Sequence, residues 1–283
     1  MLLKQCLAQF EQIYPLKISV DVARLFPIKS KYKDGEILYD RLVLGIIPAV
    51  LKHLEDTFES YDVEQIQLNE TPCENLNITN YANKLLKSNF HIVFNYEDVD
   101  AGYTAYAGVC KADAVTQRPV AAFVYINIRN NVLDDRAFTE QVFTTLLHEI
   151  HHGLGFLSSY IPLFWDRDAK QHKALNQVYT SSPSYKVRIK TPGVLKWIRD
   201  HYNCQSTSGA PLENMGKQGS QNSHFEATVF GNEVMNPSAF YNLQYTGATI
   251  AYMEDMGYFR VLEPKDKMAE ILHWGYKKGC GPL

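Results

Sequence analysis

Apolar residues recur at helical spacing near the start of the chain. Between positions 37 and 58 every fourth residue is aliphatic, in the series Leu38, Leu42, Ile46, Val50 and Leu54. Such a period predicts a helix with one apolar face. Gly45 and Pro48 fall inside this stretch, and we expect them to bend or split the helix.

Shorter stretches have the pattern of strands. Residues 17–25 partly alternate between apolar and polar side chains, and residues 91–96 and 121–128 are rich in β-branched and aromatic residues. Both patterns are typical of strands. The first half of the chain is therefore expected to combine helices with a sheet.

A second apolar helix is predicted over residues 136–153. Asp134 and Asp135 can cap its first turn, and Gly153 and Gly155 are expected to end it. Its apolar residues are Val142, Phe143, Leu146, Leu147 and Ile150. This stripe is too broad for a helix at the surface, so we expect the helix to be mostly buried.

The second half of the chain is less regular. Prolines and clusters of Ser, Gly and Asn predict loops, including residues 181–184 and 216–223. Two helices are expected among them, over residues 192–202 behind Thr191 as cap, and over residues 246–256. The order of elements predicts an α+β fold, with a sheet-bearing lobe first and a loop-rich lobe second.

The composition is that of a globular protein without a strong charge. Of 283 residues, 46% are hydrophobic and 21% are charged, and the formal net charge is −3. This balance excludes wholesale disorder and gives no electrostatic reason to expect nucleic acid as a partner. The longest apolar run, residues 42–51, is far short of the ~20 residues of a transmembrane helix, so no spanning segment is expected. Residues 1–14 lack the uninterrupted apolar segment of a signal peptide.

Candidate chemistry concentrates at the end of the buried helix. His148, Glu149 and His152 form the motif HExxH. On a helix, two histidines four residues apart share a face and can bind one metal ion, typically zinc. Glu149 lies about 100° around the helix, where it can serve as a general base rather than as a ligand. We interpret His151 as an ordinary helix histidine beside the site.

A zinc site needs a third protein ligand, and the residues alone leave its identity open. The compact spacing HExxHxxGxxH would require a histidine at position 158, where the chain has Ser158. The downstream histidines are His172, His201, His224 and His273. For a site with a carboxylate ligand, the candidates are Glu213, Glu226 and Glu233.

Several further segments resemble the leishmanolysin family of zinc metalloendopeptidases. The similar blocks are Gly155-Phe156, residues 106–128, residues 191–214, Ser223-His224-Phe225-Glu226, Gly231-Asn232-Glu233-Val234-Met235, residues 251–259 and residues 274–280. In this family the third histidine lies far downstream of HExxH and shortly before the Met-turn. Here His224 follows His152 by 72 residues and precedes Met235 by 11. The resemblance extends from about Tyr14 to the end of the chain.

The resemblance implies a metzincin-like α+β fold that binds one zinc ion per chain. Its ligands fall on His148, His152 and His224, its general base on Glu149, its turn glycine on Gly155 and its Met-turn on Met235. We therefore expect a single catalytic domain over residues 1–283. Its sheet and HExxH helix would occupy residues 14–156, its third ligand and Met-turn residues 157–283, and the zinc cleft would lie between them.

The resemblance also bears on the five cysteines. No C-x-x-C pair is present, and composition alone is equally compatible with reduced thiols. Since the family is secretory and disulfide-bonded, the resemblance implies the pairs Cys73–Cys110 and Cys204–Cys280, with Cys6 as an unrelated free thiol. It likewise implies a secreted, lumenal or cell-surface location, while an intracellular one stays open.

The function expected from the resemblance is hydrolysis of internal peptide bonds, with polypeptides as substrates. Residues 121–128 are expected to form an edge strand that pairs with the substrate. A role in cell adhesion is also implied. Two alternatives stay open: a binding or adhesion module that keeps the fold without turnover, and a protease that uses Glu226 or Glu233 as its third ligand. The sequence predicts no oligomeric state.

Overall fold

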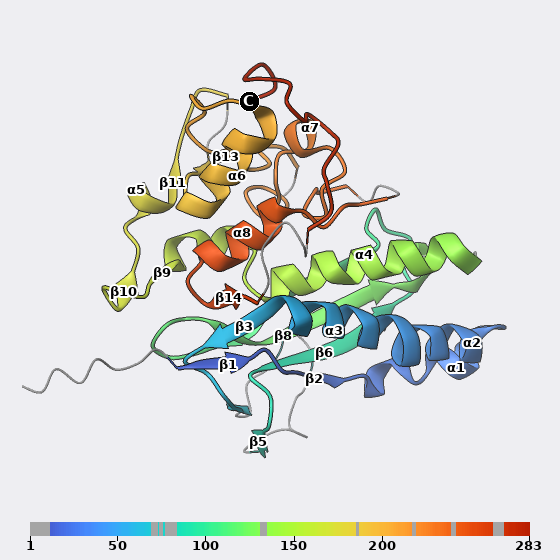
Figure 1. Cartoon of the computed structure of the whole chain (residues 1–283). Coiled ribbons are helices and arrows are strands. Elements are labelled where there is room, and N and C mark those ends of the chain that lie inside the picture. The colour runs from blue at the N-terminus through green and yellow to red at the C-terminus, as the bar shows by residue number, and fades with distance from the viewer. Residues whose placement is uncertain are drawn as a thin grey trace, which may run out of the picture.

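The computed structural model describes residues 12–68, 73, 76, 84–130, 135–184, 187–216, 219–238, 242–262 and 269–283. It is a mixed α+β structure with one four-stranded sheet and several smaller sheets. In Figure 1 the helix α4 (Asp135–Gly153) lies between this sheet and a group of helices formed by the second half of the chain. The predicted α+β class is confirmed at this level.

The largest sheet has the strand order β2-β6-β8-β7. Its strands are β2 (Ile18–Asp21), β6 (Phe90–Glu97), β8 (Pro119–Asn127) and β7 (Ala105–Ala112). The pairs β2–β6 and β6–β8 are parallel, and β7 runs antiparallel to β8. The strands predicted at 91–96 and 121–128 are therefore confirmed, whereas 17–25 gives only the short β2 followed by a 3-10 turn, η1 (Ala23–Leu25).

Strand β8 is buried along its whole length. Ala122, Val124 and Ile126 point into the main core, which includes the apolar residues of α4. Alternate residues, among them Phe123 and Tyr125, belong to a second apolar cluster on the opposite face. A strand covered on both faces has little use for polar side chains, which explains the continuous run of apolar residues over 119–126.

The long helix predicted over 37–58 is present, but part of it is π-helical instead of α-helical. It consists of α2 (Gly35–Asp40), a π-helical segment η2 (Arg41–Ile46) and α3 (Ile47–Thr57). Gly45 lies in the π-helical segment, and Pro48 lies in the first turn of α3, where proline is tolerated. Of the expected bend or split, the split does not occur, and the irregularity takes the form of the wider turns of the π-helical segment.

Helix α4 covers the predicted range and starts at Asp135, while Asp134 lies outside the described residues. Four of the five apolar residues of its predicted stripe are buried: Val142, Leu146, Leu147 and Ile150. The prediction of a mostly buried helix is confirmed.

The helices of the second half also lie where they were predicted. They are α6 (Pro192–Tyr202) and α8 (Gly247–Asp255), and they contact each other. Thr246 caps α8 by accepting a hydrogen bond from the Ala248 N–H. Thr191 precedes α6, but its hydroxyl makes no cap hydrogen bond; the Val194 N–H donates instead to Asp255 of α8 at 2.9 Å. Thr191 therefore occupies the predicted N-cap position, although its side chain does not supply the capping hydrogen bond.

The remaining elements are short. The helices and helical turns are α1 (Ile28–Lys31), η4 (Ile128–Asn130), η5 (Ser158–Leu163), α5 (Leu175–Val178) and α7 (Ala227–Phe230). The smaller sheets contain β1 (Ile13–Pro15), β3 (Phe58–Tyr61) and β14 (Phe259–Val261); β4 (Ile66–Leu68) and β5 (Lys84–Leu86); β9 (Trp165–Asp166) and β10 (Gln171–His172); and β11 (Tyr179–Thr180), β12 (Arg188–Ile189) and β13 (Ala210–Pro211). Because β14 pairs with β3, the segment near residue 260 is tied to the segment near residue 60.

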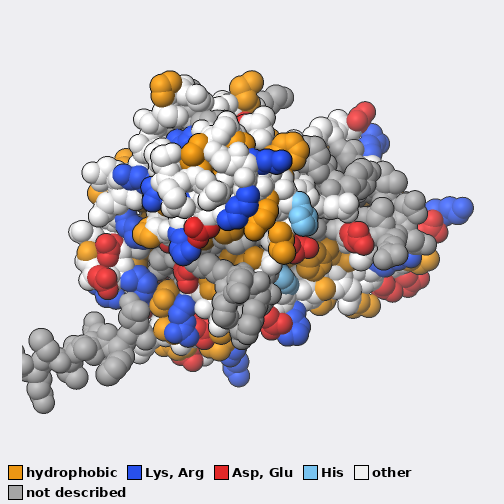
Figure 2. All heavy atoms as spheres, turned by 45° about the horizontal axis from the view of Figure 1, so that its top comes forward, with side chains coloured by type: hydrophobic (Ala, Val, Ile, Leu, Met, Phe, Trp, Pro, Cys, Tyr) orange, Lys and Arg blue, Asp and Glu red, His pale blue; other side chains and the backbone are white. Residues whose placement is uncertain are grey.

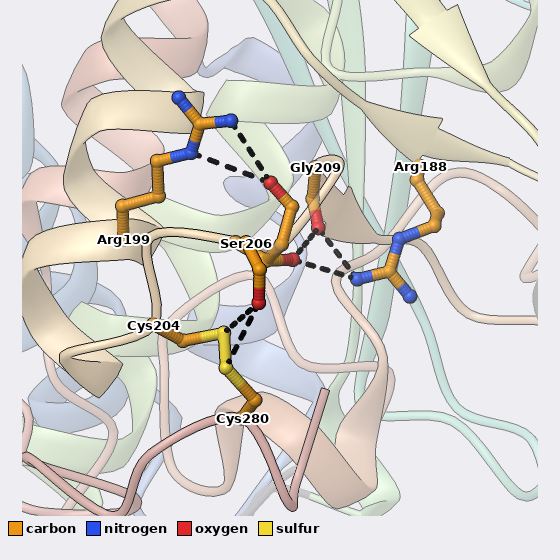
Figure 3. The surroundings of a disulfide bond; sticks show 7 residues. Arg188, Arg199, Cys204, Ser206, Gly209 and Cys280 are labelled. Carbon is orange, nitrogen blue, oxygen red and sulfur yellow. Dashed lines mark hydrogen bonds between the residues drawn. A yellow bond between two sulfur atoms is a disulfide. The ribbon is translucent and has the colours of Figure 1, made fainter.

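Both disulfides implied by the resemblance are formed, Cys73–Cys110 and Cys204–Cys280. The first joins β7 to the segment that follows β4, and the second joins the end of α6 to the C-terminal segment (Figure 3). Cys6 lies outside the described residues. Acidic and basic side chains are interspersed on the face shown in Figure 2. Within the described parts of the chain, no helix is long and apolar enough to cross a membrane.

Candidate active site

Three histidines from two distant parts of the chain meet at one point. His148 and His152 lie on the last turns of α4, and His224 lies in the loop before α7. Their Nε2 atoms are separated by 3.0 Å (His148–His152), 3.1 Å (His152–His224) and 3.2 Å (His148–His224). Among the described residues, this is the group of three His, Cys, Asp or Glu side chains able to hold a metal ion.

Each of the three imidazoles is oriented by a backbone carbonyl. Nδ1 of His148 is 2.6 Å from the Val234 oxygen, Nδ1 of His152 is 2.7 Å from the Phe156 oxygen, and Nδ1 of His224 is 3.0 Å from the Ser220 oxygen. A carbonyl oxygen only accepts hydrogen bonds, so every Nδ1 must carry the proton. In the neutral rings every Nε2 is then an unprotonated acceptor.

This arrangement fits a zinc ion. Three nitrogen lone pairs at about 3 Å repel one another unless a cation lies between them. A tetrahedral site with metal–nitrogen bonds of about 2.0–2.1 Å separates its ligand nitrogens by about 3.3 Å, close to the separations seen here. The carbonyl oxygens bonded to the three Nδ1 atoms fix the orientation of the rings, as is usual for histidine ligands of zinc.

Burial keeps the three histidines neutral. Burial first, and the neighbouring His224 second, lower the pKa of His148 to about 3. The pKa of His152 is lowered well below its usual value by burial and by the two other histidines, and burial also lowers the pKa of His224. At neutral pH the rings therefore need not lose a proton before they bind a metal ion.

Glu149 lies beside the histidines with a buried carboxyl group. Burial raises its pKa to about 8. A raised pKa suits a group that must take up and release a proton near neutral pH, and a cation held by the histidines would lower it again. The residue is positioned by the rigid helix α4, which also carries two of the three histidines.

A cleft of about 480 Å³ opens onto these side chains. Its floor includes His148, Glu149, His152 and His224. Its lining also includes residues 102–107, which lead into the start of β7, together with Gly219, Ser220 and residues 236–238. The cleft therefore gives access to the three histidines beside the edge strand β7.

The edge strand is not the one predicted. Residues 121–128 were expected to pair with the substrate, but they form β8, which has β6 on one side and β7 on the other. An internal strand has no unpaired edge to offer. The strand that borders the cleft is β7 (Ala105–Ala112), at the edge of the sheet.

The turn glycine and the Met-turn residue lie next to the group. Gly155 has a φ of +109°, which favours glycine, and a Cβ there would lie 2.7 Å from the Met256 side chain. Its carbonyl accepts from the Leu157 N–H, so the chain reverses directly behind His152. Met235 is fully buried, and its backbone oxygen accepts from the N–H of Phe225, the residue after His224.

The other candidate ligands have different partners. His151 donates from Nδ1 to the Leu147 oxygen and accepts from the Tyr245 hydroxyl, as a structural histidine would. His172 and His201 bond to the carbonyls of Leu163 and Trp274. Neither these histidines nor the exposed His273 belongs to the metal-binding group.

The carboxylate candidates are also engaged elsewhere. Glu213 accepts from the backbone N–H groups of Met215 and Ala227, and Glu226 accepts from the Thr228 hydroxyl. Glu233 is bonded within the Met-turn and to α8. None of the three is part of the metal-binding group.

Two features of the site were not predicted from the sequence. One is the edge strand β7, whose residues 105–112 contain an alternation of small and larger residues that could have indicated a strand. The other is the role of the backbone oxygens of Val234, Phe156 and Ser220, which leave no signal in the side-chain pattern.

Comparison with known proteins gives a consistent result. The family model described as leishmanolysin matches residues 38–283. The chain is 29% identical over 208 residues to a leishmanolysin-like peptidase of Caenorhabditis briggsae, covering 62% of this chain and 31% of the relative. It is 28% identical over 183 residues to a ciliated left-right organizer metallopeptidase of Xenopus laevis, covering 62% and 24%. It is 23% identical over 252 residues to a leishmanolysin homolog of Crithidia fasciculata, covering 86% and 36%. The chain spans between about a quarter and about a third of the length of these relatives.

Proposed function

Because the chain belongs to the leishmanolysin family, we propose that it is a zinc-dependent metallopeptidase that hydrolyses internal peptide bonds of proteins. The observation that carries this proposal is the convergence of three Nε2 atoms within 3.2 Å, each on a ring whose Nδ1 is bonded to a carbonyl. We assign His148, His152 and His224 as the ligands of one zinc ion. Glu149 is the general base, and Met235 and Gly155 shape the site.

The chemistry follows from the position of Glu149. When bound, zinc polarises the scissile carbonyl and makes the attacking water more acidic. Glu149 accepts a proton from this water as its oxygen attacks the carbonyl carbon, and passes the proton to the leaving amine as the carbon–nitrogen bond breaks. The same carboxyl group therefore serves twice, and its buried position on α4 holds it toward the histidines.

The substrate is proposed to bind as an extended chain along β7. An edge strand offers backbone donors and acceptors to a further strand, so it recognises peptides independently of their side chains. The cleft walls at residues 102–107 and 236–238 would contact the side chains on either side of the cleaved bond. A polypeptide, rather than a small molecule, fits such a site.

We also propose that the chain acts as one catalytic domain with two lobes, residues 14–156 and 157–283, on either side of the cleft. The two disulfides support a location in an oxidising compartment, at the cell surface, in a lumen or outside the cell. A role in cell adhesion stays a hypothesis that rests on the resemblance.

The proposal is tested with purified protein, an unfolded protein substrate and the variant Glu149→Ala. We expect cleavage that a zinc chelator abolishes and that the variant lacks, with a fall in kcat of about 10²-fold or more. The zinc content of the variant should stay at one per chain, because Glu149 is not a ligand. Glu140→Ala, an exposed glutamate on the same helix, is the matched control.

Two outcomes would contradict the proposal. Undiminished cleavage by Glu149→Ala would remove the general-base assignment. A folded, zinc-loaded wild type that cleaves nothing would favour a binding module that keeps the fold without turnover.

A further inference from the structure

We propose that Glu233 is a positioning residue for the metal centre: its carboxylate ties the Met-turn to the start of α8 and so fixes the backbone groups that orient His148 and His224. This inference rests on the proposed function in that it takes these histidines to be metal ligands. It assigns Glu233 a role different from that of a carboxylate ligand, which was one alternative from the sequence.

The carboxylate of Glu233 accepts hydrogen bonds from two separate segments. One oxygen accepts from the hydroxyls of Thr246, at 2.9 Å, and Thr249, at 2.6 Å. The other accepts from the backbone N–H of Met235. Thr246 is the N-cap of α8 and Thr249 lies in its first turn, so Glu233 joins this helix to the Met-turn.

The turn held in this way orients two of the three proposed ligands. The Val234 oxygen, one residue after Glu233, accepts from His148 Nδ1 at 2.6 Å. The Met235 oxygen accepts from the Phe225 N–H at 3.0 Å, and Phe225 directly follows His224. The peptide between Glu233 and Met235 thus contacts both ligand-bearing segments.

Burial makes this contact hard to replace. Glu233 is completely buried, so water cannot substitute for a lost partner. Removing its carboxylate leaves two hydroxyls and one backbone N–H without their acceptor. The free energy of burying these unpaired donors exceeds the net stabilisation that the hydrogen bonds provided. The turn is then expected to shift until these donors find other partners, and the Val234 oxygen moves with it.

The exposed Glu270 provides a matched comparison. Its carboxylate accepts from the Tyr245 N–H at 2.7 Å, one residue before Thr246. It therefore makes the same kind of carboxylate-to-backbone bond close to the start of α8, but it does not contact the Met-turn. Glu270→Gln therefore controls for the loss of a carboxylate charge near the start of α8, whereas positioning of the metal ligands should depend on Glu233.

The experiment measures zinc affinity by competition with a chromophoric chelator. The proteins are wild type, Glu233→Ala, Glu233→Gln, Thr249→Val and Glu270→Gln, at a temperature where circular dichroism shows each to be folded. For Glu233→Ala we expect affinity to fall by about 10- to 100-fold, as is usual when a partner of a metal ligand is lost. Glu233→Gln and Thr249→Val, which each keep part of the contact, should lose less, and Glu270→Gln should match wild type.

A second readout separates positioning from mere stabilisation. Cobalt replaces zinc, and its visible absorption band reports the geometry of the ligands. We expect this band to shift in Glu233→Ala and Glu233→Gln and to stay unchanged in Glu270→Gln. If Glu233→Ala is unfolded, Glu233→Gln and Thr249→Val carry the test.

Unchanged zinc affinity and an unchanged cobalt spectrum in folded Glu233 variants would overturn the inference, as would an equal loss in Glu270→Gln. These results are independent of turnover. A wild type that binds zinc but cleaves no protein would refute the proposed function and leave the Glu233 test intact.

Discussion

His224 differs from the other downstream histidines in what its ring nitrogens face. Its Nε2 points at His148 and His152, while Nδ1 of His172 and Nε2 of His201 bond to carbonyls outside the site. We expect His224→Ala to lower zinc affinity by more than about 100-fold, beyond the usual cost of losing an outer partner. Alanine at His172, His201 or His273 should leave the affinity unchanged within about threefold. The zinc content after dialysis and the zinc affinity from chelator competition are measured for all four variants. Equal losses of affinity at the four positions would refute the assignment of His224 as a ligand.

A second prediction at this scale concerns acid stability. His91 is fully buried on β6, and burial lowers its pKa from 6.5 to about 4. Between pH 6.5 and pH 4, His91 binds fewer protons in the folded protein than in the unfolded chain. The contribution of the neutral imidazole to the free energy of unfolding is therefore complete above about pH 6.5 and is lost as the pH falls toward 4. When the pH is lowered from 7.5 to 5, the free energy of unfolding should fall by about 2 kcal/mol because of His91.

The test compares urea denaturation of wild type and His91→Gln at pH 7.5 and pH 5. Metal loss at low pH affects both proteins and cancels in the comparison. The difference in unfolding free energy between them should shrink by about 2 kcal/mol at the lower pH, because glutamine does not titrate. A difference independent of pH would mean that His91 keeps a normal pKa in the folded protein.

Single residues of the site were predictable to different degrees. HExxH indicated two of the proposed ligands and the proposed base, because helical geometry converts spacing into a shared face. His224 lies 72 residues after His152, and no local rule connects them, so its assignment depended on the resemblance. The carbonyls that hold the three rings belong to backbone geometry and cannot be inferred from residue types.

At the scale of elements, replacing either of two helix glycines by alanine is expected to change the stability in opposite directions. Gly45 lies on an exposed face with open space around its Cα, so Gly45→Ala should stabilise the protein by about 0.5–1 kcal/mol through reduced chain entropy. Gly153 ends α4, and a Cβ there would lie 2.8 Å from the Cβ of Ala122 on β8. Gly153→Ala should destabilise by about 1–3 kcal/mol because helix and strand must move apart.

Thermal or urea unfolding of the two variants tests the pair. The comparison is informative because the substitution is the same and only the surroundings differ. Two variants with changes of the same sign would contradict the account of how closely α4 approaches the sheet.

Helices were predicted more accurately than strands, for a physical reason. Residues 192–202 form α6 with the predicted bounds, since an amphipathic period over several turns is a local signal. The two-residue strands β9 to β13 are defined only by pairing with their neighbours and carry no such period. The edge position of β7 is likewise a property of the sheet, so assigning the edge to residues 121–128 was wrong.

For the whole molecule, the sequence indicated an α+β fold but not its connections. The pairing of β14 with β3 and the approach of Glu233 to α8 depend on contacts between segments far apart in the chain. Such contacts are selected by the packing of the complete core. The disulfide pairs were implied by the resemblance alone, because four cysteines permit three pairings and spacing does not choose among them.

The disulfide Cys204–Cys280 secures the end of the chain to α6. Residues 269–283 also bond to this helix: the Lys277 and Gly279 N–H groups donate to the His201 and Tyr202 oxygens. Arg199 and Arg188 hold the loop that follows Cys204, through the carbonyls of Thr207 and Gly209 (Figure 3). The disulfide therefore attaches a mostly exposed segment to a loop that is already fixed.

Cutting this link should destabilise the whole molecule and release the segment first. The disulfide joins residues 76 positions apart, and closing such a loop stabilises a fold by about 4 kcal/mol through the unfolded state. We expect the double variant Cys204→Ser, Cys280→Ser to lose about 2–4 kcal/mol in urea unfolding, and trypsin to cut after Lys277 and Lys278 before any site in α6. The pair Cys73→Ser, Cys110→Ser is the control: its loop is 37 residues long, and the C-terminal segment should stay protected. A loss below about 1 kcal/mol with unchanged proteolysis would mean that the backbone hydrogen bonds to α6 are sufficient to hold this segment.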